Sequence, residues 1–212
     1  GCFGTMASCS FYPAHHITCG EGGLVVCNDD DLEKVIRSIR DWGRGCFCIG
    51  KQNITECGAC NKRFSEWLPS IPGEVFDHKY VYEEIGYNLK PIEVQASMLL
   101  AQIDKLPDIK RLRQRNHSLL SKIFEKYEEY FIIPVAQKMS DVNWFAFPLT
   151  IKDNAPFKRS ELCQFFESRK IQTRPYFAGN ILMQPAYTHL VGDLNLDDFP
   201  VAKKVTTDTF FL

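Results

Sequence analysis

The chain has 212 residues, of which 45% are hydrophobic and 24% are charged, the composition of a folded globular protein rather than a disordered or collagenous one. Its 25 basic and 26 acidic side chains leave a formal net charge of −1, which provides no overall field to recruit nucleic acid or an anionic membrane. The most apolar stretch, residues 96–103, is far shorter than the ~20 residues needed to span a bilayer. We therefore expect neither a nucleic acid nor a membrane as a partner.

The first 40 residues predict two strands and a helix. Over residues 10–28, β-branched and aromatic residues lie on either side of Gly20-Glu21-Gly22-Gly23, which predicts two strands joined by a glycine turn. Asp29-Asp30-Asp31 then precedes apolar residues that recur along one helical face. This spacing predicts a helix with an acidic amino-terminal cap.

Residues 40–72 are rich in glycine and cysteine and show no sustained period. They predict a long loop, and a loop of this length inside a compact domain is usually functional or braced. Pro91 opens a second helix, which breaks at Pro107 and continues in helical spacing to about Tyr130.

The remaining residues predict strands and one more helix in alternation. The strands are expected at residues 131–135, 144–151 and 171–176, and the helix at residues 160–169. Because strand and helix segments alternate along the chain, we expect an α/β fold. We place the domain boundary in the pair of helices, with one domain over residues 1–110 and the other over residues 111–212.

The first group of residues that could carry chemistry follows Ser10. A Ser-Phe pair at Ser10 leads to His15 and His16 and then to the Gly-Glu-Gly-Gly turn. By itself, a histidine pair beside a glycine turn is more often structural than catalytic. This sequence resembles the sugar aminotransferase branch of the pyridoxal-phosphate enzymes, the DegT/DnrJ/EryC1/StrS family, in which Ser-Phe precedes the lysine that binds the cofactor. Counting from Ser10, the lysine position of that family is occupied by His15.

The exchange of lysine for histidine implies a different reaction. Imidazole forms no stable Schiff base with the cofactor aldehyde, but its pKa near 6.5 allows it to move protons at neutral pH. A transaminase needs the lysine, whereas a dehydratase that uses pyridoxamine 5′-phosphate does not. The resemblance therefore implies that His15 is catalytic.

The second constellation is a group of cysteines. Four of the nine, Cys46, Cys48, Cys57 and Cys60, fall within fifteen residues, which favours a metal or redox site in a reducing compartment, the cytoplasm, over disulfides. On spacing alone, a structural zinc site and an iron–sulfur cluster are equally good interpretations. The loop resembles that of the family's iron–sulfur 3-dehydratases, which implies a 2Fe-2S cluster held by Cys46, Cys48 and Cys60, with Cys57 as the alternative to Cys60 and the fourth ligand upstream of residue 1.

The resemblance covers nearly the whole chain. It continues through residues 77–80, 86–90, 143–148, 173–180 and 184–185. It implies an aspartate-aminotransferase-like fold of type I, with Ser10 contacting the cofactor phosphate and Asn88 reaching the phosphate of the neighbouring subunit of a homodimer. Without the resemblance, Asn88 would be read as a turn residue.

By this resemblance, residues 1–110, including the cysteine loop 40–72, are the carboxyl-terminal portion of the large cofactor-binding domain. Residues 111–212 are a truncated small domain. We therefore expect an internal fragment that lacks the amino-terminal part of the large domain and the extreme carboxyl terminus, and that is inactive by itself.

The implied reaction is C3 dehydration of a nucleotide sugar, CDP-4-keto-6-deoxy-D-glucose, in the biosynthesis of 3,6-dideoxysugars of bacterial lipopolysaccharide. An NADH-dependent flavin and iron–sulfur reductase would supply electrons through the cluster. Three alternatives stay open: a sugar aminotransferase, a cluster-free 3-dehydratase, and a non-catalytic α/β fragment braced by zinc.

Overall fold

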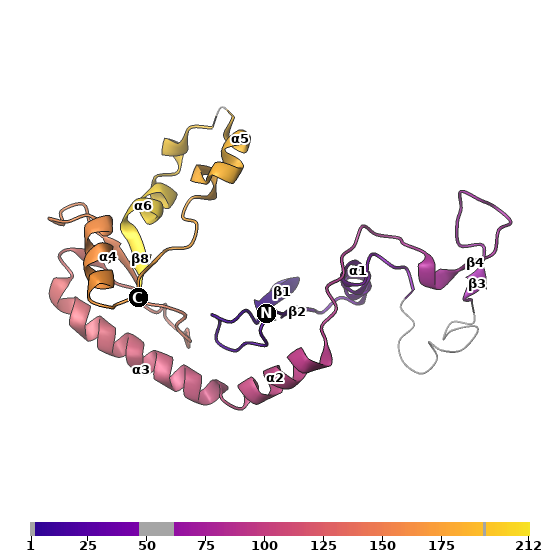
Figure 1. Ribbon diagram of the computed structural model, residues 1–212, viewed down its shortest axis with the longest axis horizontal. Helices are drawn as coiled ribbons and strands as arrows, with labels where there is room; N and C mark the ends of the chain where they lie inside the picture. The colour runs from indigo at the N-terminus through magenta and orange to yellow at the C-terminus, as the bar shows by residue number, and fades with distance from the viewer. Residues whose placement is uncertain (1–2, 47–61, 193) are drawn as a thin grey trace. The chain divides into compact units, whose positions relative to one another are not determined.

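The structure is a computed structural model that describes residues 3–46, 62–192 and 194–212 (Figure 1). Two compact units make up the chain, Gly1–Asp104 and Lys105–Leu212, coloured indigo to magenta and pink to yellow in Figure 1. The division falls between the helices α2 (Glu93–Ile103) and α3 (Leu106–Phe124). The boundary expected between residues 110 and 111 lies inside α3.

The first unit begins with an antiparallel hairpin and a helix. Strand β1 (Met6–Ser10) pairs along its whole length with β2 (Gly23–Cys27), so that Ser10 lies opposite Gly23. Helix α1 (Asp30–Arg40) follows, and the side chain of its N-cap, Asp29, accepts hydrogen bonds from the second and third backbone N–H groups that come after it. The acidic cap expected from the sequence is confirmed.

The first strand lies upstream of the position that we expected. Ser10 ends β1 instead of beginning a strand, and residues 11–22 form a loop. The buried Phe11 closes this loop, because its N–H donates to the Gly22 carbonyl at 2.8 Å and its carbonyl accepts the Cys19 N–H at 3.2 Å. The aromatic residues that suggested a strand therefore serve as the centre of a loop.

The start of the cysteine loop packs against residues 81–90 of the same unit. The Trp42 N–H donates to the Tyr87 carbonyl at 2.9 Å, and the Gly45 N–H donates to the Val81 carbonyl at 3.0 Å. Gly43 has a φ of +82°, and a Cβ there would lie 1.7 Å from the carbonyl oxygen of Glu84. Because no side chain fits, this close approach of two backbone segments requires glycine.

A short hairpin and a 3-10 turn follow in the first unit. The expected loop over residues 40–72 contains the short strand β3 (Phe64–Ser65), which pairs antiparallel with β4 (Phe76–Asp77). A 3-10 turn, η2 (His78–Tyr80), follows β4 directly. The hairpin therefore carries the chain from the end of the cysteine loop to the segment against which that loop begins.

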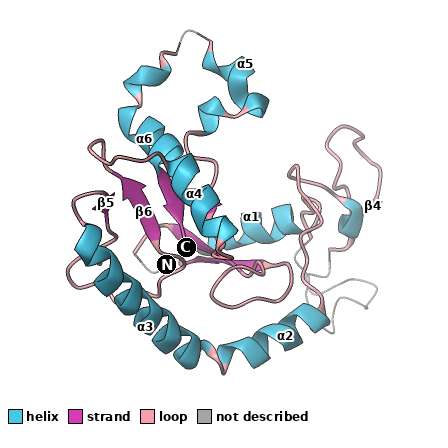
Figure 2. Ribbon diagram, turned by 60° about the vertical axis from the view of Figure 1, so that its left-hand side comes forward, coloured by secondary structure: helices cyan, strands magenta, loops and turns pink. Residues whose placement is uncertain are grey.

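The second unit is built on a four-stranded antiparallel sheet in the order β5-β6-β8-β7. Leu149 of β6 and Phe210 of β8 lie opposite each other and are fully buried. Phe124 of α3 and Phe166 of α4 pack into the same core, and Figure 2 shows α4 lying across the sheet. The strands are β5 (Phe131–Ile132), β6 (Pro148–Ile151), β7 (Arg174–Pro175) and β8 (Thr209–Phe211); the helices after α3 are α4 (Arg159–Ser168), α5 (Thr188–Val191) and α6 (Pro200–Asp208).

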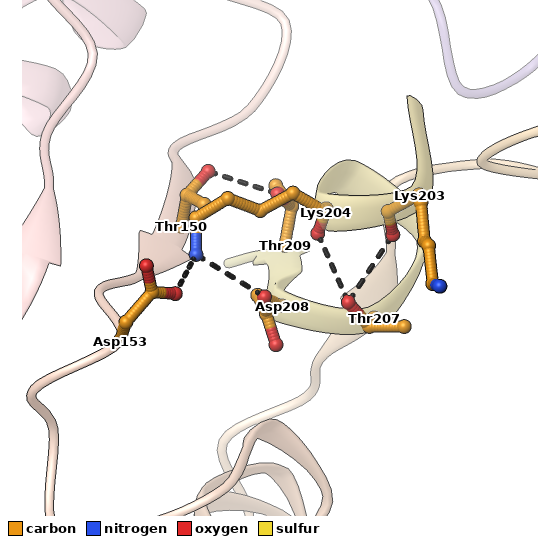
Figure 3. Close-up of polar contacts among 7 residues, drawn as sticks. All are labelled: Thr150, Asp153, Lys203, Lys204, Thr207, Asp208 and Thr209. Atoms are coloured by element: carbon orange, nitrogen blue, oxygen red, sulfur yellow. Dashed lines mark hydrogen bonds and ion pairs between the residues drawn. The ribbon is translucent and has the colours of Figure 1, made fainter. Parts of the chain in front are cut away.

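Polar contacts connect α6 to the sheet (Figure 3). The ammonium group of Lys204 on α6 contacts the carboxylates of Asp153, just after β6, and of Asp208. Beside it, the hydroxyls of Thr150 and Thr209 hydrogen-bond across β6 and β8 at 2.8 Å. These contacts hold the end of α6 where the chain turns into β8.

The helix expected at residues 160–169 is confirmed as α4, but all three strands expected in this unit are shorter than the pattern suggested. Of residues 131–135, only the two residues of β5 form a strand. Within residues 144–151 the strand β6 begins at Pro148, although Phe147 also exchanges backbone hydrogen bonds with Leu212 at 3.1 and 3.2 Å. Before it, the guanidinium of Arg113 on α3 donates hydrogen bonds to the carbonyls of Trp144 and Phe145 at 3.0 and 2.7 Å. Of residues 171–176, only β7 joins the sheet. Among the described residues, no helix is both long enough and apolar enough to cross a bilayer.

Candidate functional site

Ser10 and His15 lie together at the end of β1. The Ser10 carbonyl lies 3.3 Å from Nδ1 of His15, and the Ser10 hydroxyl oxygen accepts the Tyr12 N–H at 3.2 Å. A hydroxyl that accepts one hydrogen bond still has its own proton to donate. The end of β1 thus brings together a hydroxyl donor and an imidazole, the two groups that the sequence singled out here.

The His15 ring is oriented by contacts within its own loop. Its backbone N–H donates to the Tyr12 carbonyl at 3.0 Å, and its ring meets the Tyr12 ring edge-on, with 6.0 Å between the centroids. Because a carbonyl only accepts, the contact with Ser10 selects the tautomer with a proton on Nδ1. In the neutral imidazole, the basic lone pair is then on Nε2.

The glycine turn that follows is shaped by close approach to Cys19. A Cβ on Gly22 would lie 2.6 Å from the Sγ of Cys19, which is buried. Gly20 has a φ of +85°, in the left-handed region, and a Cβ placed there would meet nothing within 4 Å. The two glycines are therefore needed for different reasons, Gly22 for space and conformation and Gly20 for conformation alone.

Gln95 joins α2 to this turn. Its Nε2 donates to the Glu21 carbonyl at 2.7 Å, while its Oε1 accepts the Ile92 N–H at the start of the helix. One side chain thus caps α2 and fixes the turn beside the Ser10–His15 pair. The sequence analysis missed Gln95, because no local pattern shows that a residue 74 positions away contacts Glu21.

Asn88 lies at the base of the cysteine loop. It forms an antiparallel bridge with Asp41, and its Oδ1 accepts a hydrogen bond from the Lys90 ammonium at 2.8 Å. Lys90 also pairs with Asp41 at 2.8 Å, and its Nζ lies 3.3 Å from the centroid of the Trp42 ring. The Asn88 amide is thereby oriented with its oxygen toward Lys90, and Asp41 offsets the charge of that lysine.

Cys46 is half-buried and is the last described residue before residues 47–61. The other proposed cluster ligands, Cys48, Cys57 and Cys60, lie outside the described residues, so the iron–sulfur and zinc interpretations stay predictions. Within residues 3–46, 62–192 and 194–212, no three His, Cys, Asp or Glu side chains gather into a group that could hold a metal.

Beyond residue 61, Arg63 and Asp77 form a bidentate ion pair. Nε of Arg63 donates to Oδ1 of Asp77 at 3.0 Å, and its second nitrogen donates to Oδ2 at 2.6 Å. The hydrogen bonds from Arg63 lower the pKa of Asp77. The pKa of Arg63 is raised, mainly by the hydrogen bond to Asp77 and also by the nearby charges of Tyr80 and Cys46. Arg63 therefore lies within electrostatic reach of Cys46, although the cysteine loop separates them in sequence.

Next to this ion pair, His78 stacks on Trp67 with 3.7 Å between the ring centroids and 11° between the planes. The His78 N–H also donates to the Arg63 carbonyl at 2.8 Å. The sequence marked residues 77–80 as part of the resemblance without assigning them a role. The structure shows that they hold the returning end of the cysteine loop.

Comparisons with known proteins support this fold. The model of the DegT/DnrJ/EryC1/StrS aminotransferase family matches residues 1–212. The chain is 40% identical to lipopolysaccharide biosynthesis protein RfbH of Salmonella typhimurium over 100% of its own length and 47% of that protein. It is 42% identical to a dTDP-4-dehydro-2,6-dideoxy-D-glucose 3-dehydratase of Saccharopolyspora spinosa over 88% of its own length and 39% of the other.

Solved structures show the same fold. A GDP-4-keto-6-deoxy-D-mannose-3-dehydratase of E. coli with bound hydrated PLP superposes with a TM-score of 0.72 at 23% identity, over 99% of this chain and 50% of that one. DesV of S. venezuelae, in complex with a ketimine intermediate, gives 0.72 at 22% identity, over 99% and 46%. The chain spans about half the length of these relatives and has the aspartate-aminotransferase-like fold of type I over that span. Fold and sequence agree that the chain belongs to the DegT/DnrJ/EryC1/StrS aminotransferase family.

Proposed function

We propose that the protein is a 3-dehydratase of a nucleotide-linked 4-keto-6-deoxyhexose that works with pyridoxamine 5′-phosphate, with CDP-4-keto-6-deoxy-D-glucose as the substrate. The observation that carries the proposal is the histidine at position 15, oriented by the Ser10 carbonyl, where the family has its cofactor-binding lysine. Relatives with 3-dehydratase names in two organisms support the reaction class. The expected assignments of the first unit to the large domain and of the second to the small domain are part of this proposal.

The donor set at the end of β1 fits a phosphorylated pyridine cofactor. The Ser10 hydroxyl has a proton to give to a phosphate oxygen, and the amide of Asn88, with its oxygen engaged by Lys90, would present its N–H₂ group to a phosphate of the neighbouring subunit in a homodimer. When bound, pyridoxamine phosphate supplies an amine that condenses with the sugar ketone and a ring that accepts electrons.

In this proposal His15 is the base. The Nδ1–H group is held by the Ser10 carbonyl at 3.3 Å, so Nε2 takes the proton from the C4′ carbon. Imidazole is a common general base in proteins, so a histidine held in this orientation suits the task. The departing C3 hydroxide requires a proton as well, which the protonated imidazole of His15 would return.

For the reductive half of the reaction, we propose a 2Fe-2S cluster held by Cys46, Cys48 and Cys60, with Cys57 as the alternative to Cys60. Such a cluster supplies one-electron transfer, here from an NADH-dependent flavin and iron–sulfur reductase. Support for the cluster itself comes from the resemblance of the loop.

The experiment is anaerobic purification of the full-length protein, followed by its visible spectrum, its iron and zinc content, and a dehydration assay with pyridoxamine phosphate and CDP-4-keto-6-deoxy-D-glucose. A red-brown protein with about two irons per chain supports the cluster. Zinc, or no metal at all, would instead support a cluster-free dehydratase or a non-catalytic domain braced by zinc. A 4-amino sugar formed with glutamate as donor would establish an aminotransferase instead.

The role of His15 is tested by its replacement. His15→Asn abolishes solvent exchange of the C4′ proton and leaves cofactor binding intact, whereas the matched control His16→Asn, at the adjacent half-buried histidine, keeps the exchange. Retained exchange in His15→Asn would remove this residue from the base role.

A further inference from the structure

One face of the sheet in the second unit carries a cluster of aromatic rings. Phe210 of β8 points into the core, so the next residue, Phe211, points to the opposite face. Its ring lies 5.6 Å from that of Phe177 and 6.4 Å from that of Tyr176, measured between centroids. We call this group the aromatic cluster; its members are Phe145, Tyr176, Phe177 and Phe211.

Phe177 has an unusual backbone conformation. Its φ is +51°, a region that bulky side chains rarely adopt, and its side chain is 64% exposed. Burial in the core therefore does not explain the strain. Strained residues of this kind persist where the surroundings determine the backbone, and they concentrate at ligand-binding loops.

The loop around Phe177 is held by hydrogen bonds on both sides. The Phe177 N–H donates to the Pro175 carbonyl at 2.7 Å, and the Gly179 N–H donates to the Tyr176 carbonyl at 3.1 Å. Nε2 of Gln184 donates to the Ala178 carbonyl at 3.0 Å. These hydrogen bonds fix the backbone in the conformation that exposes the Phe177 ring to solvent.

A guanidinium group accompanies the rings. Arg174 of β7 lies directly opposite Phe211 of β8, and directly opposite residues of paired strands project to the same face of a sheet. Arg174 is exposed and lies within electrostatic reach of Glu167, whose Oε1 accepts hydrogen bonds from the N–H and the hydroxyl of Thr173. The face therefore combines the exposed rings of Tyr176 and Phe177 and the half-buried rings of Phe145 and Phe211 with a cation next to them.

We propose that the aromatic cluster and Arg174 bind the nucleoside diphosphate part of the substrate. A nucleobase stacks on aromatic rings with little dependence on its identity, and the guanidinium is suited to phosphate oxygens through paired hydrogen bonds. A nucleoside diphosphate carries both features a short distance apart. A single-stranded nucleic acid carries them too, but one arginine and a net charge of −1 are a poor match for a long polyanion. The inference rests on the proposed function for the attached sugar.

Isothermal titration of the full-length protein with CDP at constant ionic strength tests the proposal, with cytidine and a ten-residue oligothymidylate as further probes. Phe177→Gly relieves the backbone strain and removes the ring, so it weakens CDP binding about tenfold while the thermal unfolding midpoint stays the same or rises. Phe177→Tyr retains the ring and the affinity. Phe165→Ala, at an exposed ring on α4, is the matched control and leaves affinity unchanged.

Arg174→Gln separates the phosphate contact from stacking. It weakens binding of CDP and reduces the salt dependence of its affinity, but leaves binding of cytidine unchanged. Equal CDP affinity in the wild type, Phe177→Gly and Arg174→Gln would overturn the proposal, as would no binding of CDP, or tighter binding of the oligonucleotide than of CDP. Loss of affinity in Phe177→Tyr as complete as in Phe177→Gly would also overturn it.

Failure of this inference can be distinguished from failure of the proposed function. If the wild type dehydrates the nucleotide sugar while the Phe177 and Arg174 variants bind CDP normally, the proposed function stands, but the proposed binding of the nucleoside diphosphate by the aromatic cluster and Arg174 is wrong. If CDP binding depends on these residues but no dehydration occurs, the face stands and the reaction is wrong.

Discussion

The glycine turn beside His15 allows a steric cause to be separated from a conformational one. In Gly22→Ala the new Cβ would lie 2.6 Å from the Sγ of the buried Cys19, so the sulfur must move and its hydrogen bond to the Glu21 carbonyl at 3.3 Å is lost. In Gly20→Ala only the backbone conformation opposes the change, because the new Cβ would meet nothing within 4 Å.

The expected magnitudes follow from these two environments. Gly20→Ala lowers the local opening free energy by about 1 kcal/mol, the typical effect of a side chain at positive φ. Gly22→Ala lowers it by about 2–3 kcal/mol, because overpacking against Cys19 adds to the conformational effect. Removal of the sulfur in Cys19→Ala restores part of this loss, with a coupling energy of about 1–2 kcal/mol between the two sites.

Native-state hydrogen exchange of the Phe11 amide is the appropriate assay, because that N–H donates to the Gly22 carbonyl and reports opening of this loop rather than of the whole chain. The double-mutant cycle of Gly22→Ala with Cys19→Ala is compared with the cycle of Gly20→Ala with Cys19→Ala. Additive effects in the first cycle, or equal coupling in both, would refute the steric argument.

Three further predictions concern the second unit. Burial lowers the pKa of His117, so its contribution to stability is fully present above its ordinary pKa near 6.5 and is lost as the pH falls below that value. In His117→Phe this part of the pH dependence of urea unfolding disappears, and an unchanged dependence of the unfolding free energy on pH would contradict this role of His117. Leu149→Ala removes a fully buried side chain and lowers the free energy of unfolding by about 3 kcal/mol, against about 0.5 kcal/mol or less for the exposed Leu119→Ala; similar thermal shifts in the two variants would count against the core described above. Lys204→Met breaks the contacts with Asp153 and Asp208, but since its side chain is 32% exposed the loss is at most about 1 kcal/mol; it should vanish in about 1 M salt, and persistence there would show that the charge is not the cause.

Local sequence signals predicted the elements that depend on neighbours in the chain. The acidic run before α1 predicted its cap, because Asp29 contacts N–H groups only two and three residues ahead. The helix α4 and the break between α2 and α3 were also predicted, since periodicity and Pro107 act over a few residues. The family was identified for the same reason, because its Ser-Phe and Gly-Glu-Gly-Gly motifs are contiguous.

Contacts between distant residues could not be predicted in this way. The strand expected from Ser10 onward ends there instead, because Phe11 closes a loop onto Gly22. The strand expected at residues 144–151 begins only at Pro148, and the carbonyls of Trp144 and Phe145 before it accept hydrogen bonds from Arg113, 31 and 32 positions away. Neither of these contacts is visible in a local pattern.

The sequence by itself determined the histidine at position 15, the spacing of the cysteines and the alternation of helices and strands, since each is a matter of residue type and short spacing. Only the tertiary structure decided that Gln95 fixes the glycine turn, that Arg63 lies within electrostatic reach of Cys46, and that Arg174 shares a face with an exposed aromatic cluster. These are pairings between segments separated by many residues. Their geometry depends on strand register and on packing of the folded chain, and neither can be read from residue order.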